Sequence, residues 1–62
     1  MPAPGDEVTL RVLGPVGPVL TAGVVRLAWA RTVLVELPDP PDGFGAGELL
    51  EVDVTRLVAV SN

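Results

Sequence analysis

The stretch "RLAWARTVLVEL", residues 26–37, decides the fold, because it fits either one helix or a pair of β-strands. It contains no Gly, Pro, Asn or Asp, and its alanines, arginines and leucines are good helix formers. Against a helix, residues 24–37 hold five β-branched residues and no continuous polar face, and no capping residue directly precedes Val24. The pattern therefore favours strand, turn and strand, with a helix over residues 24–37 as the alternative.

Alternation within this stretch assigns its apolar side chains to a core face. The expected core residues are Val25, Leu27 and Trp29 on the first strand, and Val33, Val35 and Leu37 on the second. The turn is expected at residues 30–32, in a type I geometry that ordinary residues tolerate. Trp29 is therefore predicted to be buried; the alternative is an exposed aromatic anchor at the tip of the hairpin.

Two flanking stretches also alternate with a period of two. They are "DEVTLRVL" (residues 6–13), with Val8, Leu10 and Val12 on one face, and "ELLEVDV" (residues 48–54), with Leu50, Val52 and Val54 on one face. One short strand over residues 57–60 is expected to follow a single 3₁₀ turn at residues 55–57. The chain is therefore predicted to be all-β, a small five-stranded barrel with one 3₁₀ turn before the last strand.

Two Gly- and Pro-rich stretches separate these strands. The Gly-Pro pairs in residues 14–18 predict an extended loop, with the next strand beginning near Val19 or Gly23. Gly23 itself indicates a bulge or a close backbone approach. Residues 38–47, "PDPPDGFGAG", predict a second loop with tight turns.

This order of elements resembles the Src-homology-3-like (SH3-like) barrel. "GDEVTLRV" resembles its opening strand, "VTRLVAV" its 3₁₀ turn and closing strand, and "AGVVRLAWARTVLVEL" is similar to the middle strands of KOW and Tudor-type members. The resemblance is one of apolar positions and turns and covers most of the chain. It implies a single barrel domain over residues 6–60, after a lead-in at 1–5 and before an end at 61–62, and it implies an architecture far more than an activity.

Composition limits the chemistry that the chain can perform. Its 62 residues include no Cys and no His, so disulfides and the usual zinc and copper ligand sets are absent. Four arginines against eight carboxylates give a net charge of −4, which disfavours nucleic acids and anionic membranes as partners. No apolar run reaches about 18 residues and the first residues lack the pattern of a secretory signal, so a cytoplasmic location is expected.

Catalysis is disfavoured because the chain also lacks Lys and Tyr, which leaves only carboxylates for acid–base work. The acidic residues are interpreted as solvated surface charges. The acidic loop "DPPDG" lacks a calcium-binding pattern, and "GFGAG" lacks the context of a phosphate-binding loop. "PDPP" is interpreted as a stiff loop rather than a polyproline ligand. We therefore expect no enzymatic activity, no cofactor and no metal.

The candidate functional residues are those suited to binding another protein. Trp29 stands between Arg26 and Arg31, and Trp and Arg are enriched at the energetic centres of interfaces. Phe44 lies between two glycines and is expected either to cover the open end of the barrel or to await a partner. Four apolar residues fall opposite the predicted core face, where exposed patches indicate interaction: Leu13, Val24, Leu34 and Leu49.

These residues predict a non-catalytic assembly or adaptor subunit that binds a protein partner or further copies of itself. The KOW and Tudor-type resemblance implies a rival class, a nucleic-acid-binding module. That class requires all four arginines to converge on one surface: Arg11, Arg26, Arg31 and Arg56. A third class is an accessory subunit of a multi-subunit enzyme or a viral structural component.

Overall fold

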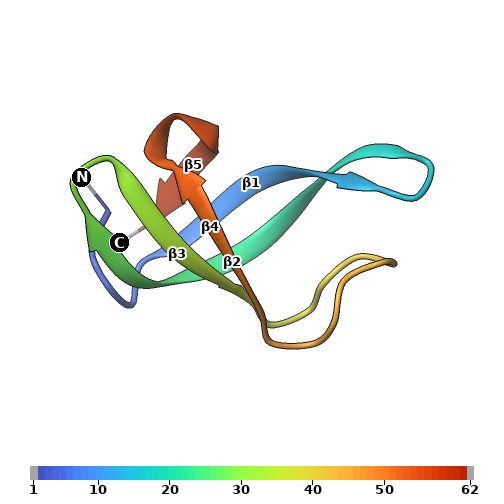
Figure 1. The fold of residues 1–62 in the computed structure, drawn as a ribbon, viewed down its shortest axis with the longest axis horizontal. Helices are drawn as coiled ribbons and strands as arrows, with labels where there is room; N and C mark the ends of the chain where they lie inside the picture. Colours follow the sequence, from blue (N-terminus) through green and yellow to red (C-terminus); the bar gives the residue numbers. More distant parts are fainter. Residues whose placement is uncertain (1, 62) are drawn as a thin grey trace.

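The computed structural model describes residues 2–61 and is built from one antiparallel β-sheet (Figure 1). The predicted all-β class is confirmed, as is the 3₁₀ turn before the last strand. The alternative of a helix over residues 24–37 is wrong. The elements are β1 (Glu7–Gly14), β2 (Gly17–Trp29), β3 (Thr32–Leu37), β4 (Glu48–Asp53), the 3₁₀ turn η1 (Val54–Arg56) and β5 (Leu57–Ser61).

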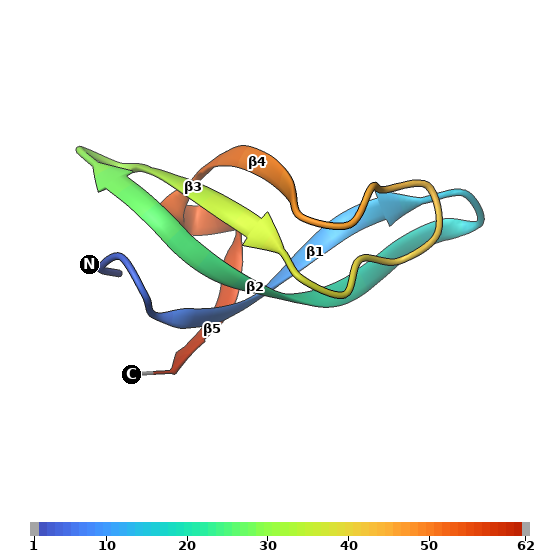
Figure 2. The same cartoon turned by 90° about the horizontal axis from the view of Figure 1, so that it is seen from below.

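The strands lie in the order β4-β3-β2-β1-β5, so β4 and β5 form the two edges of the sheet. The three residues of η1 join these edges, which means that the sheet coils until its edges meet at one end (Figures 1 and 2). No strand pairing between β4 and β5 continues from that point within residues 2–61. The predicted barrel is therefore not closed, because its two short edge strands meet only through η1.

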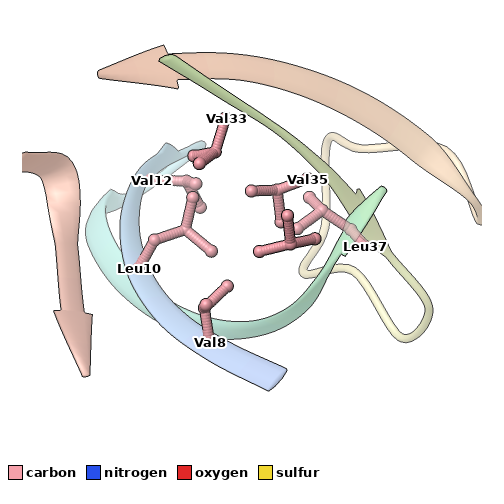
Figure 3. Packing of buried hydrophobic residues seen from close by; sticks show 7 residues of the cluster. Val8, Leu10, Val12, Val33, Val35 and Leu37 are labelled. Atoms are coloured by element: carbon pink, nitrogen blue, oxygen red, sulfur yellow. The ribbon is translucent and has the colours of Figure 1, made fainter. Parts of the chain in front are cut away.

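The core lies on the concave side of the coiled sheet and is aliphatic (Figure 3). Each strand that contributes to it does so through alternate residues, as a period of two predicts. This confirms the predicted core faces of β1 and β3. The buried hydrophobic residues of this core are Val8, Leu10, Val12, Val25, Val33, Val35 and Leu37.

A β-bulge in β2 changes which side chains of this strand face the core. The register with β3 shifts between Val25 and Leu27, so Arg26 is the extra residue. An extra residue reverses the alternation beyond it. Ala28 then packs against the core, whereas Leu27 and Trp29 point outward. The predicted burial of these two side chains is wrong, and Trp29 is 45% exposed.

The turn between β2 and β3 is tighter than expected. Trp29 pairs with Thr32, so only Ala30 and Arg31 form the loop. The favoured two-residue hairpin loops have a positive φ at the first or at both central residues, because such turns match the twist of the flanking strands. Ala30 has a φ of 53°, a conformation that usually requires Gly or Asn. The prediction of a type I turn with ordinary dihedrals is therefore wrong.

The first hairpin is longer than its sequence indicates. The pairing of β1 with β2 runs to Gly14 and Gly17, so the predicted loop at residues 14–18 is instead the end of a hairpin. Because β2 pairs with β3 only from Val24 onward, the distal part of this hairpin is a two-stranded extension. We call residues 11–20 the arm; it projects beyond the other strands in Figures 1 and 2.

Gly23 lies one residue before β2 begins to pair with β3. A Cβ atom at this position would meet the Val35 Cγ1 atom and would lie 3.3 Å from the carbonyl oxygen of Glu36. Val35 is fully buried, so its side chain has no room to yield. The predicted close backbone approach at Gly23 is confirmed.

Candidate protein-binding surface

The convex side of β2, β3 and β4 carries the main group of candidate residues; we call it the outer face. Strand register arranges its side chains in three rows that run across the strands. Residues directly opposite each other in such rows have Cβ atoms about 4.5–5.5 Å apart. The rows are Val24–Glu36–Leu49, Leu27–Leu34–Glu51 and Trp29–Thr32–Asp53.

The apolar residues of the outer face form a continuous group. Leu27 lies directly opposite Leu34, and Leu49 lies on the next strand one row away. Leu27, Leu49 and Trp29 are each about half exposed, whereas Leu34 is partly covered by its neighbours. Adjacent exposed apolar side chains of this size mark interaction surfaces more often than they occur by chance.

Two ion pairs flank this apolar group, one in each outer row. The Nε atom of Arg26 lies 2.6 Å from the Oε1 atom of Glu36 and donates a hydrogen bond to it. At the other end, the Nε atom of Arg31 lies 3.8 Å from the Oδ2 atom of Asp53. Exposed pairs of this kind add little stability. Their effect is to orient two guanidinium groups beside the apolar residues.

Asp53 also anchors the start of η1. Its Oδ1 atom accepts hydrogen bonds from the backbone N–H of Thr55 at 2.9 Å and from the Thr55 hydroxyl at 2.7 Å. These bonds, and to a smaller degree the charge of Arg31, hold the pKa of Asp53 below its usual range against a weak opposing effect of burial. The carboxylate that orients Arg31 is therefore ionised at neutral pH.

Phe44 does not belong to the outer face. Its side chain is half-buried and packs against the core, which agrees with the expectation that it covers the open end of the sheet. The loop around it is held by backbone hydrogen bonds, from the N–H of Phe44 to the Pro41 oxygen and from the N–H of Gly47 to the Leu37 oxygen. Six of the eight candidate residues thus share the outer face, whereas Phe44 packs against the core and Leu13 lies on the arm.

Sequence reasoning missed Leu27 as a surface residue, because the bulge at Arg26 is not visible in a pattern of alternation. It also missed two strongly exposed residues of the arm, Val16 and Leu20. Leu13, which was expected on the non-core face, is 76% exposed. The signal that could have identified the arm is the adjacency of two Gly-Pro pairs, which fits a hairpin end as well as a loop.

The four arginines fall into two groups by their contacts. Arg26 and Arg31 each pair with a carboxylate on the outer face. Arg56 instead extends from η1 to the arm, where its Nη2 atom donates a hydrogen bond of 3.3 Å to the carbonyl oxygen of Arg11. Among residues 2–61, neither Arg11 nor Arg56 forms an ion pair.

Other kinds of site are poorly represented in the described part of the chain. Residues 2–61 contain no group of three acidic, His or Cys side chains placed to hold a metal ion. A shallow surface hollow is lined by residues of β1 and β2, including Glu7, Thr9 and Ala22, together with Pro38 and Ser61. No helix formed by residues 2–61 has the length and apolarity that crossing a bilayer requires.

Comparison with known proteins gives no family assignment. No protein-family description matches the chain, and neither a curated protein nor a solved structure matches it. The function is therefore argued from the surfaces of the molecule alone.

Proposed function

We propose that the protein is a non-catalytic binding module that holds another protein against its outer face. The observation that carries this proposal is the half-exposed Trp29 beside Leu27 and Leu34, with an oriented guanidinium group at each end of the apolar group. Interfaces combine an apolar centre with a polar rim, and Trp and Arg contribute most to their free energy of binding. The outer face contains this combination within three strands.

We further propose that the module is a relative of the SH3-like barrels. The strand order, with β5 beside β1 and a 3₁₀ turn before β5, supports this assignment. In this proposal the open seam between β4 and β5 is a departure from a closed barrel. The architecture supplies a rigid sheet behind the outer face, which limits the conformational entropy lost on binding.

The bulge at Arg26 supports a binding role for the outer face. It turns Leu27 and Trp29 outward, which leaves a large aromatic ring in water although a one-residue change of register would bury it. Bulges commonly re-aim side chains next to functional sites. A chain that needed Trp29 only for stability would gain more from burying it.

The test is to place a photo-reactive benzoylphenylalanine at Leu34, in the middle row of the outer face, and to irradiate the protein in an extract of its source cells. The matched control carries the same group at Ala59, an exposed residue of β5. We expect a discrete adduct from position 34 and none of that size from position 59. The cross-linked protein is then identified, purified and titrated against the unlabelled module.

In this titration, binding should shift the emission of Trp29 to the blue and protect it from quenchers. Leu27→Ser and Trp29→Ser should each weaken binding by about tenfold or more, as expected for central interface residues. Leu13→Ser, on the arm, is the control and should bind like the wild type. Equal adducts at both positions, or binding that is indifferent to Leu27 and Trp29, would contradict the proposal.

A further inference from the structure

The arm is a second exposed apolar surface, separate from the outer face. Leu13 and Leu20 point to its convex side, and Val16 at its tip is 96% exposed. The concave side of the arm is covered, because Val12 is buried and a Cβ atom on Gly43 would lie 3.6 Å from the Cδ atom of Pro15. Only the convex side of the arm and its tip are therefore open to a partner.

Charge distinguishes the arm from the rest of the molecule. Residues 11–20 contain one arginine and no carboxylate. Arg11 lies directly opposite Leu20, and the guanidinium group of Arg56 bonds to the Arg11 carbonyl. Arg11 therefore lies beside Leu20, and the guanidinium group of Arg56 lies beside the Arg11 backbone; neither cation forms an ion pair within residues 2–61. The rest of the chain, outside residues 11–20, holds three arginines and all eight carboxylates, a net charge of −5.

The backbone of the arm is also open along one edge. Within the described residues 2–61, β2 has no strand partner on its β3 side between Gly17 and Gly23. Alternation of hydrogen bonds in an antiparallel pair directs the N–H and C=O groups of Leu20 toward this edge. Such an edge accepts a further strand, and a two-stranded hairpin is only marginally stable on its own.

We propose that the arm of one copy of the protein docks on the β4 edge of a second copy. β4 is the other sheet edge with complementary properties, because it carries Glu48, Glu51 and Asp53 and the exposed apolar side chain of Leu49. The two arginines beside the arm meet these carboxylates, and its exposed leucines meet Leu49. Repulsion between like charges disfavours the pairing of two β4 edges or of two arms and so fixes the orientation.

This contact is heterologous, because it joins two different surfaces of identical chains. Contacts of this kind propagate into rings or open filaments rather than stopping at a dimer. The proposal goes beyond the binding of a foreign protein at the outer face and does not depend on it. The two surfaces share the β4 residues Leu49, Glu51 and Asp53, but the arm is used only in self-association.

The first test is sedimentation equilibrium of the purified protein from about 10 μM to about 1 mM, at about 20 mM and about 1 M NaCl, where screening lengths differ several-fold. We expect species larger than a dimer at high protein concentration and low salt, and dissociation at high salt. A monomer throughout the series at low salt would overturn the proposal. Growth that stops at a dimer, or that salt leaves unchanged, would also overturn it.

The second test uses charge. Arg11→Gln combined with Arg56→Gln should weaken self-association by about tenfold or more, in the range expected of close charge pairs. The control, Ala59→Glu combined with Ser61→Glu on β5, lowers the net charge by the same two units and should retain most of the self-association. An equal loss in both double variants would mean that net charge alone acts, and would overturn the assignment to the arm.

The third test assigns the acidic surface. Glu51→Arg should weaken self-association by itself, and mixing it with a charge-reversed arm, Arg11→Glu with Arg56→Glu, should restore assembly between the two variants. Failure of the mixture to associate would overturn the assignment to β4. Trp29→Ser should leave self-association unchanged, so the result separates this proposal from binding at the outer face. Far-ultraviolet circular dichroism confirms that each variant is folded.

Discussion

Leu10 and Leu13 lie three residues apart on β1, yet Leu13 belongs to the arm and Leu10 to the rest of the sheet, which we call the body. Leu10 is 1% exposed and contacts the core, whereas Leu13 is 76% exposed. Both belong to one regular strand paired with β2. The two side chains point to opposite faces of β1: Leu10 points to the concave face around which the body coils, and Leu13 to the convex face of the arm, which extends past β3 and β4 (Figure 1).

Burial therefore depends both on the face that a side chain occupies and on what covers that face. Alternation decides which face a side chain occupies, and tertiary structure decides whether anything covers that face. In the body, the concave face is covered by neighbouring strands. On the arm, the convex face carries leucines that nothing within residues 2–61 covers, which is why it points to a partner rather than to a core.

The contrast between the body and the arm is tested most directly by removing the same atoms from a leucine of each region. Leu10→Ala should lower the free energy of unfolding by about 2–5 kcal/mol, because it leaves a cavity in a core of seven buried residues. Leu13→Ala should change it by no more than about 0.5 kcal/mol. Urea denaturation followed by Trp29 fluorescence measures both.

A chain this small has little stability to lose, so Leu10→Ala can leave a largely unfolded population. Leu10→Val then provides a smaller deletion, with an expected cost of about 1 kcal/mol. Similar losses from the Leu10 and Leu13 variants at a protein concentration where the chain is monomeric would show that the arm has a core of its own.

Gly23 lies at the boundary between the arm and the body, just before β2 begins to pair with β3, and it provides the second test. Gly23→Ala should lower the free energy of unfolding by about 1–3 kcal/mol, because the added methyl group overpacks against Val35. Gly45→Ala is the matched control, since its Cβ atom would meet only the Glu48 Oε1 atom at 3.8 Å. Chemical denaturation measures the free energy of unfolding of both variants. Equal values would contradict the close approach at Gly23.

Much of the fold is readable from the sequence because the core strands alternate without interruption. Val8, Leu10 and Val12, like Val33 and Val35, follow a strict period of two, and each is buried. The 3₁₀ turn is also readable, from its place between two alternating stretches. Closure of the barrel cannot be read from the sequence, because it depends on whether β4 and β5 pair with each other. Both strands are short, and their alternation indicates only which side chains face the core.

The candidate surface was readable only in part. Trp29, Arg26 and Arg31 were recognised from their residue types, which interfaces favour. Their shared surface depends on the bulge at Arg26, a single extra residue that period-two reasoning does not register. The turn at Ala30 could not be predicted either, because a two-residue turn with positive φ is normally recognised by a Gly or Asn in the sequence.

A substitution at Ala30, in the turn between β2 and β3, should change the free energy of unfolding less and in the opposite direction. Ala30→Gly should raise the free energy of unfolding by about 0.5–1 kcal/mol, because Gly adopts a positive φ without the steric cost that Ala bears. The same change in a regular strand, Ala59→Gly, should lower it by about 0.5–1 kcal/mol. Thermal denaturation of the pair measures the difference. A loss of stability in both would mean that Ala30 is unstrained.

The smallest expected effect concerns Asp53, at the end of the body that meets η1. Because the pKa of Asp53 is lower in the folded protein than in the unfolded chain, its contribution to stability is present above the unfolded pKa and is lost as the pH falls through the folded pKa. Asp53→Asn should therefore flatten the acid limb of stability against pH while changing neutral stability little, since Asn can also accept the Thr55 hydrogen bond. Urea midpoints between about pH 5 and pH 2 measure the slope. The control is Asp42→Asn, which removes one charge from the loop. If the wild type and the Asp53→Asn variant have identical acid limbs, the Thr55 contacts do not couple the protonation of Asp53 to folding.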